Sequence, residues 1–115
     1  MSVIPDVDLT ISALSDPTRR AVVDLLRSKP YRAGEMAEAL SMTPPALSRH
    51  LRILRKSGLI IDDEVEGDAR VRLYRLQPEG FASLRNWLDE LEAFWSDQLQ
   101  SFKRHAESRT ARRKQ

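Results

Sequence analysis

Three prolines at positions that suit the start of a helix limit how this chain can fold. Asp16-Pro17 and Thr43-Pro44 each place a good helix-capping residue before a proline that suits the first helical turn. Pro78 suits the first position of a later helix in the same way. Pro30 and Gly58 then stand where the first two helices should end. The predicted helices run from Pro17 to Pro30, from Thr43 to about Ser57 and from Pro78 to about Glu107.

Two further helices are indicated by apolar spacing. A short first helix has four apolar residues at steps of three and four, namely Ile4, Val7, Ile11 and Leu14. A third helix covers roughly residues 33–40 and leads into a tight turn at Ser41-Met42. Two short helices joined by a tight turn are typical of a helix-turn-helix.

A β-hairpin is predicted after the fourth helix. Residues 59–65 and 70–76 read as two strands, and Gly67-Asp68 between them has the chemistry of a turn. The predicted fold class is therefore mainly α with one β-hairpin. The order of its elements matches a winged helix-turn-helix with a long C-terminal helix that serves dimerisation.

Length and composition bound the class of protein. The chain has 115 residues, of which 41% are hydrophobic and 31% charged, so a single domain with a core is expected. It contains no cysteine, which excludes disulfides, thiolate zinc fingers and cysteine nucleophiles. Apolar runs are too short to span a bilayer and the start lacks a secretory signal, so we expect a cytoplasmic protein without a membrane partner. Residues 1–107 are predicted to form the domain and residues 108–115 a disordered basic tail.

Charge is segregated along the chain although the net charge is only +2. Residues 17–58 contain nine Lys and Arg against three Asp and Glu, whereas residues 59–102 contain four against ten. A basic segment of this kind suggests an anionic partner, although it could equally be a solvated surface.

The fourth helix has the pattern of a DNA-reading helix. Leu47, Leu51 and Leu54 form one apolar stripe. The opposite face and its flank carry Pro45, Ser48, Arg49, Arg52 and Lys56. Cations there can contact phosphates, and arginine can also read guanine in the major groove. The alternative is a helix that merely exposes soluble residues, but its place between a tight turn and a hairpin favours DNA reading. His50 lies near the buried edge and could bond a phosphate or hydrogen-bond locally.

The last helix repeats its apolar residues every seven positions. Phe81, Leu88, Trp95 and Phe102 form one row, with Leu84 and Leu91 between them and Trp87 and Phe94 beside them. The face is wider than one small domain needs, so it predicts a homodimer interface shared with the first helix, rather than packing on the chain's own helices. The predicted interface residues are Ile4, Val7, Ile11, Phe81, Leu84, Leu88, Leu91, Trp95 and Phe102. A ligand pocket lined by Trp87, Phe94 and Trp95 is the alternative.

The chain resembles the ArsR/SmtB-type winged-helix transcriptional repressors over about residues 10–80. The matching stretches are residues 13–20, 34–40, 45–51, 54–59 and 74–76. The resemblance implies a dimeric cytoplasmic repressor whose fourth helix enters the major groove and whose hairpin lies along the DNA backbone. The last helix looks closest to a metal-free branch of this family, whose members often regulate small operons, commonly their own.

The sequence departs from the family at the metal site, the reading helix and the wing. Arg32 and Gly34 occupy the positions of the Cys-x-Cys metal motif, and Pro44 replaces a glutamine that can contact bases. Base reading then depends more on Thr43, Ser48, Arg49 and Arg52. Acids surround the turn of the hairpin and would repel phosphate, which leaves Arg70 and Arg72 as the expected wing contacts.

Together these features predict a sequence-specific regulator of transcription that binds a double-stranded operator. We expect a homodimeric repressor without metal or cofactor, released by an organic ligand, a partner protein or a change in expression level, and the resemblance implies that it regulates its own operon. An interaction module such as an anti-repressor is the alternative, favoured by the acidic wing and Pro44. An enzyme is not expected, because His50 and His105 are the only histidines and the chain has no phosphate loop or serine elbow.

Overall fold

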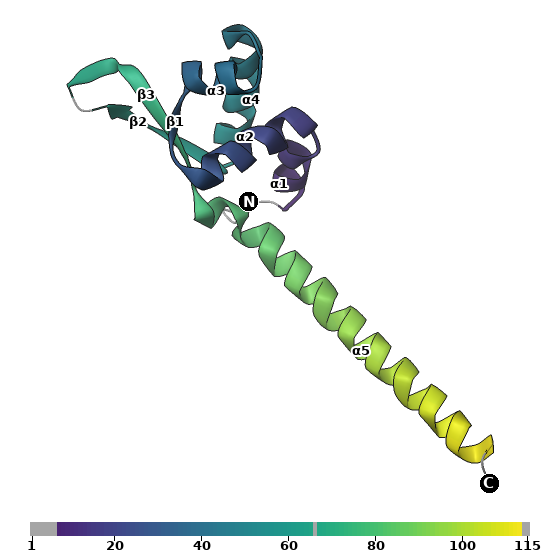
Figure 1. Cartoon of the computed structure of the whole chain (residues 1–115). Helices are drawn as coiled ribbons and strands as arrows, with labels where there is room; N and C mark the ends of the chain where they lie inside the picture. The colour runs from purple at the N-terminus through teal and green to yellow at the C-terminus, as the bar shows by residue number, and fades with distance from the viewer. Residues whose placement is uncertain (1–6, 66, 114–115) are drawn as a thin grey trace. The chain divides into compact units, whose positions relative to one another are not determined.

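The computed structural model describes residues 7–65 and 67–113, without the side chains of residues 68–70 and 111–113. The predicted interface residue Ile4 lies outside the described residues. The elements are α1 (Val7–Leu14), α2 (Pro17–Ser28), β1 (Tyr31–Arg32), α3 (Ala33–Ala39), α4 (Pro44–Lys56), β2 (Ile60–Val65), β3 (Asp68–Leu76), the 3₁₀ helix η1 (Pro78–Phe81) and α5 (Ala82–Arg113). This order confirms the predicted winged helix-turn-helix, with α3 and α4 as its two short helices (Figure 1).

The predicted helix caps at Asp16 and Thr43 are confirmed. The Asp16 carboxylate accepts hydrogen bonds from the backbone N–H of Thr18 at 2.8 Å and of Arg19 at 3.1 Å. The bond from the Arg19 backbone holds the pKa of Asp16 below its usual range. Thr43 Oγ1 accepts from the backbone N–H of Ala46 at 3.4 Å. These bonds satisfy donors that have no partner inside a helix, so α2 and α4 begin where the sequence indicates.

Both α3 and α4 end in the same closing motif. After α4, the N–H of Leu59 bonds the carbonyl of Leu54 at 3.0 Å while Gly58 adopts φ of 77°. After α3, the N–H of Met42 bonds the carbonyl of Ala37 at 2.9 Å, and Ser41 takes the left-handed position with φ of 53°. The motif needs one residue with positive φ, which glycine adopts without strain and serine does not. It makes the turn between α3 and α4 tight enough for a helix-turn-helix.

The sheet has three antiparallel strands in the order β1-β3-β2. The predicted hairpin is confirmed, with Ile60 opposite Leu76 and Glu64 opposite Arg72, and β3 begins at Asp68 rather than at residue 70. Sequence analysis missed β1, which is only two residues long and pairs Tyr31 with Tyr74. Two residues show no alternation, so only the distant partner reveals such a strand.

The core of residues 7–84 is formed by ten buried apolar side chains from the first four helices and the start of the hairpin. They are Ala13, Val22, Leu26, Met36, Ala37, Leu47, Leu51, Leu54, Leu59 and Ile60. The helices α2, α3 and α4 meet in this core, and the strands extend from it as the wing (Figure 1). The core therefore fixes α4 between α2 and the wing.

The last helix departs from the sequence prediction at both ends. Residues 78–81 form a 3₁₀ turn, so α5 begins at Ala82 rather than at Pro78. At the other end α5 continues to Arg113, whereas a disordered tail was predicted from residue 108. Alanine and arginine favour helices even without an apolar period, which accounts for the extension. The chain divides into two compact units, Met1–Leu84 and Arg85–Gln115, where sequence analysis predicted one domain over residues 1–107.

Gly80 in η1 lies against the turn that ends α4. A Cβ atom at this position would stand 1.8 Å from the Gly58 carbonyl oxygen and 2.6 Å from its carbonyl carbon. Both atoms are backbone, so a side chain at residue 80 would force η1 away from the turn. Gly34, by contrast, is exposed in α3 with nothing within 4 Å of such a Cβ.

We predict that Gly80→Ala destabilises the protein by about 3 kcal/mol, because the new methyl group overlaps backbone that cannot yield without repacking. The matched control Gly34→Ala should stabilise by about 0.5 kcal/mol, since alanine favours a helix and meets no neighbour there. Urea unfolding followed by circular dichroism measures both changes. A Gly80→Ala variant as stable as wild type would show that the close approach of η1 to Gly58 does not exist.

Candidate nucleic-acid interface

Helix α4 buries one face and exposes the other, as its sequence predicts. Leu47, Leu51 and Leu54 are 1%, 4% and 0% exposed and lie in the core. The predicted DNA-facing residues outside this stripe are all exposed, namely Thr43, Pro45, Ser48, Arg49, Arg52 and Lys56. Because the apolar stripe anchors the helix, these residues face solvent together.

The three cations of this face have no ion-pair or hydrogen-bond partner in the part of the chain that the structure describes. Among the described residues, no carboxylate or hydrogen-bond acceptor engages the charged ends of Arg49, Arg52 and Lys56. A cation that is not neutralised within the protein is available to an external anion. We call the six exposed residues that the sequence predicts to face DNA the DNA-facing surface, namely Thr43, Pro45, Ser48, Arg49, Arg52 and Lys56.

The arginines nearer the wing behave differently, because they are paired with its acids. Asp62 accepts from Arg72 Nε at 2.9 Å and from Arg55 Nη1 at 3.3 Å. Arg72 Nη1 also lies 3.3 Å from Glu64, across the hairpin. A separate pair joins Arg75 Nε to Asp63 at 2.8 Å.

Asp62 is the centre of this network. Its side chain is 9% exposed, and this burial opposes ionisation. Hydrogen bonds from Arg72 and Arg55 outweigh the burial and hold the pKa of the carboxyl below its usual range. Asp62 is therefore ionised at neutral pH and joins the end of α4 to the wing.

These pairs change how the acidic wing must be understood. Sequence analysis treated its acids as charges that would repel phosphate, but Asp62, Asp63 and Glu64 are each matched by an arginine. Arg72, predicted to contact DNA from the wing, is held by two carboxylates and its side chain is 43% exposed. The side chain of Arg70 lies outside the described part of the chain. The register of the hairpin, which sets Glu64 opposite Arg72, was the signal that could have revealed the pairing.

His50 lies at the junction of α4 with the start of α2. Its Nδ1 is 3.4 Å from Arg19 Nη1 and 4.0 Å from Asp16 Oδ1, and its side chain is 21% exposed. Arg19 is itself fixed by bonding the carbonyl of Ala13 at 2.6 Å. The local contact that sequence analysis gave as one alternative is thus present, and a phosphate contact through the other ring nitrogen stays a prediction.

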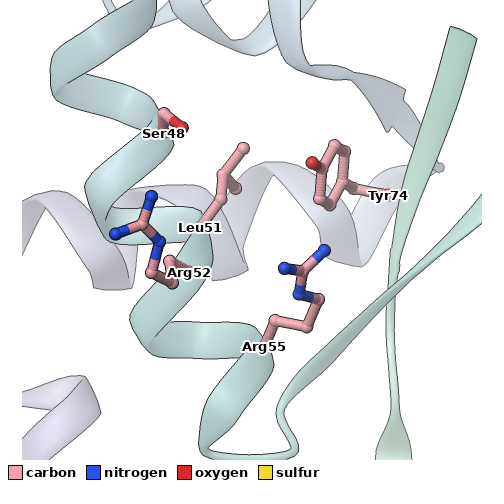
Figure 2. A pocket seen from close by; sticks show the side chains of 5 residues that line it. All are labelled: Ser48, Leu51, Arg52, Arg55 and Tyr74. Carbon is pink, nitrogen blue, oxygen red and sulfur yellow. The ribbon is translucent and has the colours of Figure 1, made fainter. Parts of the chain in front are cut away.

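A small pocket of about 100 Å³ lies between α4 and β3. Its lining residues are Ser48, Leu51, Arg52, Arg55 and Tyr74 (Figure 2). Sequence analysis named Ser48 and Arg52 but missed Arg55 and Tyr74. Only the pairing of Tyr74 with its neighbouring strands brings it opposite α4, so no local sequence signal could have found it.

The residues predicted for the dimer interface fall into two groups. In α5, Leu88, Leu91, Trp95 and Phe102 are 47%, 37%, 55% and 73% exposed. In the first unit Ile11 is 42% exposed, while Val7 and Leu84 are half-buried and Phe81 packs against the chain's own core. The three aromatic residues of the alternative ligand pocket, Trp87, Phe94 and Trp95, are each about half exposed, at 45%, 54% and 55%.

The described residues contain neither a membrane-spanning helix nor a cluster of metal-ligating side chains. No helix among them is long and apolar enough to cross a membrane. No group of three or more histidine or acidic side chains in residues 7–65 and 67–113 is placed to hold a metal ion.

The architecture and the exposed basic face of α4 define a winged helix-turn-helix DNA-binding regulator of transcription. The profile of the family described as "Bacterial regulatory protein, arsR family" matches residues 16–62, from the cap of α2 into β2. The HTH-type transcriptional regulator Rv2034 of Mycobacterium tuberculosis is 38% identical over 102 residues, which cover 89% of this chain and 90% of that protein. The chain therefore belongs to the ArsR family of transcriptional regulators.

Other relatives agree with this assignment. The transcriptional repressor SdpR of Bacillus subtilis is 44% identical over 50 residues, which cover 44% of this chain and 56% of that protein. A crystal structure of the ArsR family transcriptional regulator RHA00566 superposes with a TM-score of 0.68 at 32% identity, over 78% of this chain and 90% of that one. An ArsR-like transcriptional regulator from Rhodococcus sp. RHA1 gives a TM-score of 0.72 at 26% identity, over 89% and 91% of the two chains.

Proposed function

We propose that this chain is a homodimeric transcriptional repressor that reads its operator through α4 without a metal effector. The observation that carries the proposal is the set of three cations on α4 that have no partner among the described residues. Two relatives in the comparisons, SdpR and SmtB, are named repressors, which supports repression as the mode of regulation.

On the operator, residues of the DNA-facing surface, together with the neighbouring His50, are proposed to take two roles. Lys56 and His50 are proposed to contact phosphates, which position the protein but carry no sequence information. Thr43, Ser48, Arg49 and Arg52 are proposed to reach base edges, and an arginine can bond two acceptors of guanine at once. Arg72 and Arg70 are proposed as weaker contacts from the wing, since Arg72 is already shared by two carboxylates.

We predict that Arg49→Ala or Arg52→Ala weakens operator binding by about 1–3 kcal/mol, because each removes a direct contact in the major groove. Arg27→Ala is the matched control, since Arg27 is an exposed arginine of α2 that pairs with Asp24 at 3.5 Å. It should change binding by less than about 0.5 kcal/mol. A mobility-shift titration with the DNA upstream of the gene measures all three. Equal binding by both α4 variants and wild type would contradict the groove assignment.

The proposal of a homodimer is supported by the exposed apolar face of α5. Its large side chains from Trp87 to Phe102 are between 37% and 73% exposed, which is costly for a helix in water. A second copy can cover this face, and two-fold symmetry would let the two α4 helices read two half-sites about one helical turn apart. The exposed Ile11 of α1 is proposed to join the same interface.

We predict that Leu91→Glu disrupts the dimer and abolishes operator binding, because the interface would have to bury an unpaired carboxylate. Ser96→Glu is the control, since it adds the same charge to an exposed position of α5 outside the heptad rows. Sedimentation velocity measures the assembly of each variant, and circular dichroism checks that each is folded. An intact Leu91→Glu dimer would remove α5 from the interface.

The proposal that no metal acts as effector is supported by the ligands that the chain offers. The chain has no thiol, and Arg32 and Gly34 occupy the positions where related regulators carry Cys-x-Cys. Zinc sensing needs three or four ligands, typically thiolates and imidazoles held close together. We propose instead that release depends on an organic ligand, a partner protein or a change in expression level, and that the regulated genes include the chain's own.

We predict that micromolar zinc, cadmium or arsenite leaves the affinity of the protein for its operator unchanged. The measurement is a fluorescence-anisotropy titration of metal into the preformed complex, with a chelator added at the end. Dissociation that the chelator reverses would contradict this proposal and require a metal site elsewhere in the chain.

The alternative is an interaction module, which the sequence favours through its acidic wing and Pro44. The pairing of Asp62, Asp63 and Glu64 with arginines weakens the first of these two arguments, so operator binding is the function proposed here. Footprinting on the chain's own promoter separates the two functions, because an anti-repressor would protect no DNA there.

A further inference from the structure

The pocket between α4 and β3 has a chemistry of its own. It offers two hydroxyl groups, from Ser48 and Tyr74, and two guanidinium groups, from Arg52 and Arg55. Leu51 forms its apolar wall and is 4% exposed. No carboxylate is among the lining residues. A lining of this kind, which combines positive charge with hydroxyl donors, suits a phosphate group.

Arg55 is held in a position to serve this pocket. Its Nη1 lies 3.3 Å and 3.4 Å from the two oxygens of Asp62. Among the described residues this is the only contact of its guanidinium, so Nε and Nη2 can donate to another group. Asp62 forms an ion pair with Arg72 as well as with Arg55. Its negative charge therefore does not cancel the positive charge of the pocket.

Tyr74 is positioned by the sheet. It belongs to the central strand β3, with Tyr31 opposite it on one side and Asp62 on the other. Its ring is half-buried against the core, while its hydroxyl points from β3 toward α4 (Figure 2). Because neighbours on both sides fix the strand, the hydroxyl needs little ordering before it binds a ligand.

We propose that this pocket binds one phosphate of the DNA backbone and that Tyr74 and Arg55 are the DNA-binding residues that hold it, while Ser48 and Arg52 keep their proposed contacts with base edges. The inference rests on the proposed operator binding and extends it from α4 to the base of the wing. The source is DNA because Ser48 and Arg52 belong both to the pocket and to the DNA-facing surface, so a duplex against α4 brings its backbone to this opening. The phosphate would then tie α4 and the wing to the same strand.

Tyr74→Phe tests the proposal with the smallest change, since it removes one hydroxyl and keeps the packing of the ring. Tyr31→Phe is the matched control, because Tyr31 is a half-buried tyrosine of the adjacent strand that does not line the pocket. Tyr74→Phe should bind about three- to tenfold more weakly, the range expected for one hydrogen bond. The loss should be equal for operator and unrelated duplex, because a phosphate contact carries no sequence information.

The phosphate that the pocket binds can be located with a set of operators, in each of which one backbone phosphate is replaced by an uncharged methylphosphonate. For wild type, several positions in each half-site should weaken binding, because Lys56 and His50 are also proposed to contact phosphates. For Tyr74→Phe the loss should shrink at one of these positions only, the phosphate that the pocket binds. The salt dependence of binding should match wild type for Tyr74→Phe, which changes no charge, and should become less steep by about one unit for Arg55→Gln. Thermal melting checks that Arg55→Gln remains folded without its bond to Asp62.

The outcomes separate this inference from the function on which it rests. Wild type that binds no operator would overturn the proposed function, and the inference with it. Wild type that binds, with Tyr74→Phe equal to it at every methylphosphonate position, would overturn the pocket alone. A further experiment titrates inorganic phosphate into the free protein. Binding at micromolar phosphate that releases operator, and is lost in Tyr74→Phe, would show that the pocket takes a small anion and overturn the DNA source.

Discussion

The burial of one face of α4 is the constraint on which the rest of the structure depends. Leu47, Leu51 and Leu54 enter the core and are almost fully inaccessible to water. A helix anchored along one stripe has no freedom to rotate, so its polar residues must all face the opposite way. The same stripe holds α4 against α2 and the wing. The DNA-facing surface is therefore a consequence of core packing rather than an independent feature.

The arginines of the first unit divide into paired and unpaired groups. This division determines where positive charge is available on the candidate nucleic-acid interface. Asp62 gathers Arg55 and Arg72 at the base of the wing, where mutual neutralisation costs little because the groups also hydrogen-bond. Arg49 and Arg52 have no such partner among the described residues. Positive charge is thus concentrated on α4, while the wing is held in place by its own ion pairs. Because the wing is fixed in this way, Tyr74 is already directed toward α4. The proposed binding of a DNA phosphate would then cost little conformational entropy of the protein.

In helix α5, unlike in α4, the apolar residues that the sequence pattern aligns on one face are not buried in the single chain. Its apolar residues recur at a heptad spacing, yet Leu88, Leu91 and Trp95 stay exposed in the single chain. Contiguous exposed apolar faces of this kind mark surfaces that bind another protein, which is why a second copy is proposed to cover this one. The described residues of the first unit share a core of buried apolar side chains, and the second unit contains the helix α5 beyond Leu84. The second unit is the part of the chain for which a partner matters most.

The sequence alone determined the order of the elements, the caps at Asp16 and Thr43 and the buried stripe of α4, because each depends on residues within a few positions of one another. It also determined the family resemblance, which depends on the order and spacing of short motifs along the chain. Tertiary structure decided the rest. The strand β1 and the place of Tyr74 depend on pairing between segments some forty residues apart. The partners of Asp62 depend on the register of the hairpin and on where α4 ends. The close approach of Gly80 to Gly58 likewise needs the fold. Local patterns specify which face of an element is buried, but the contacts between distant elements are set only when those faces pack together.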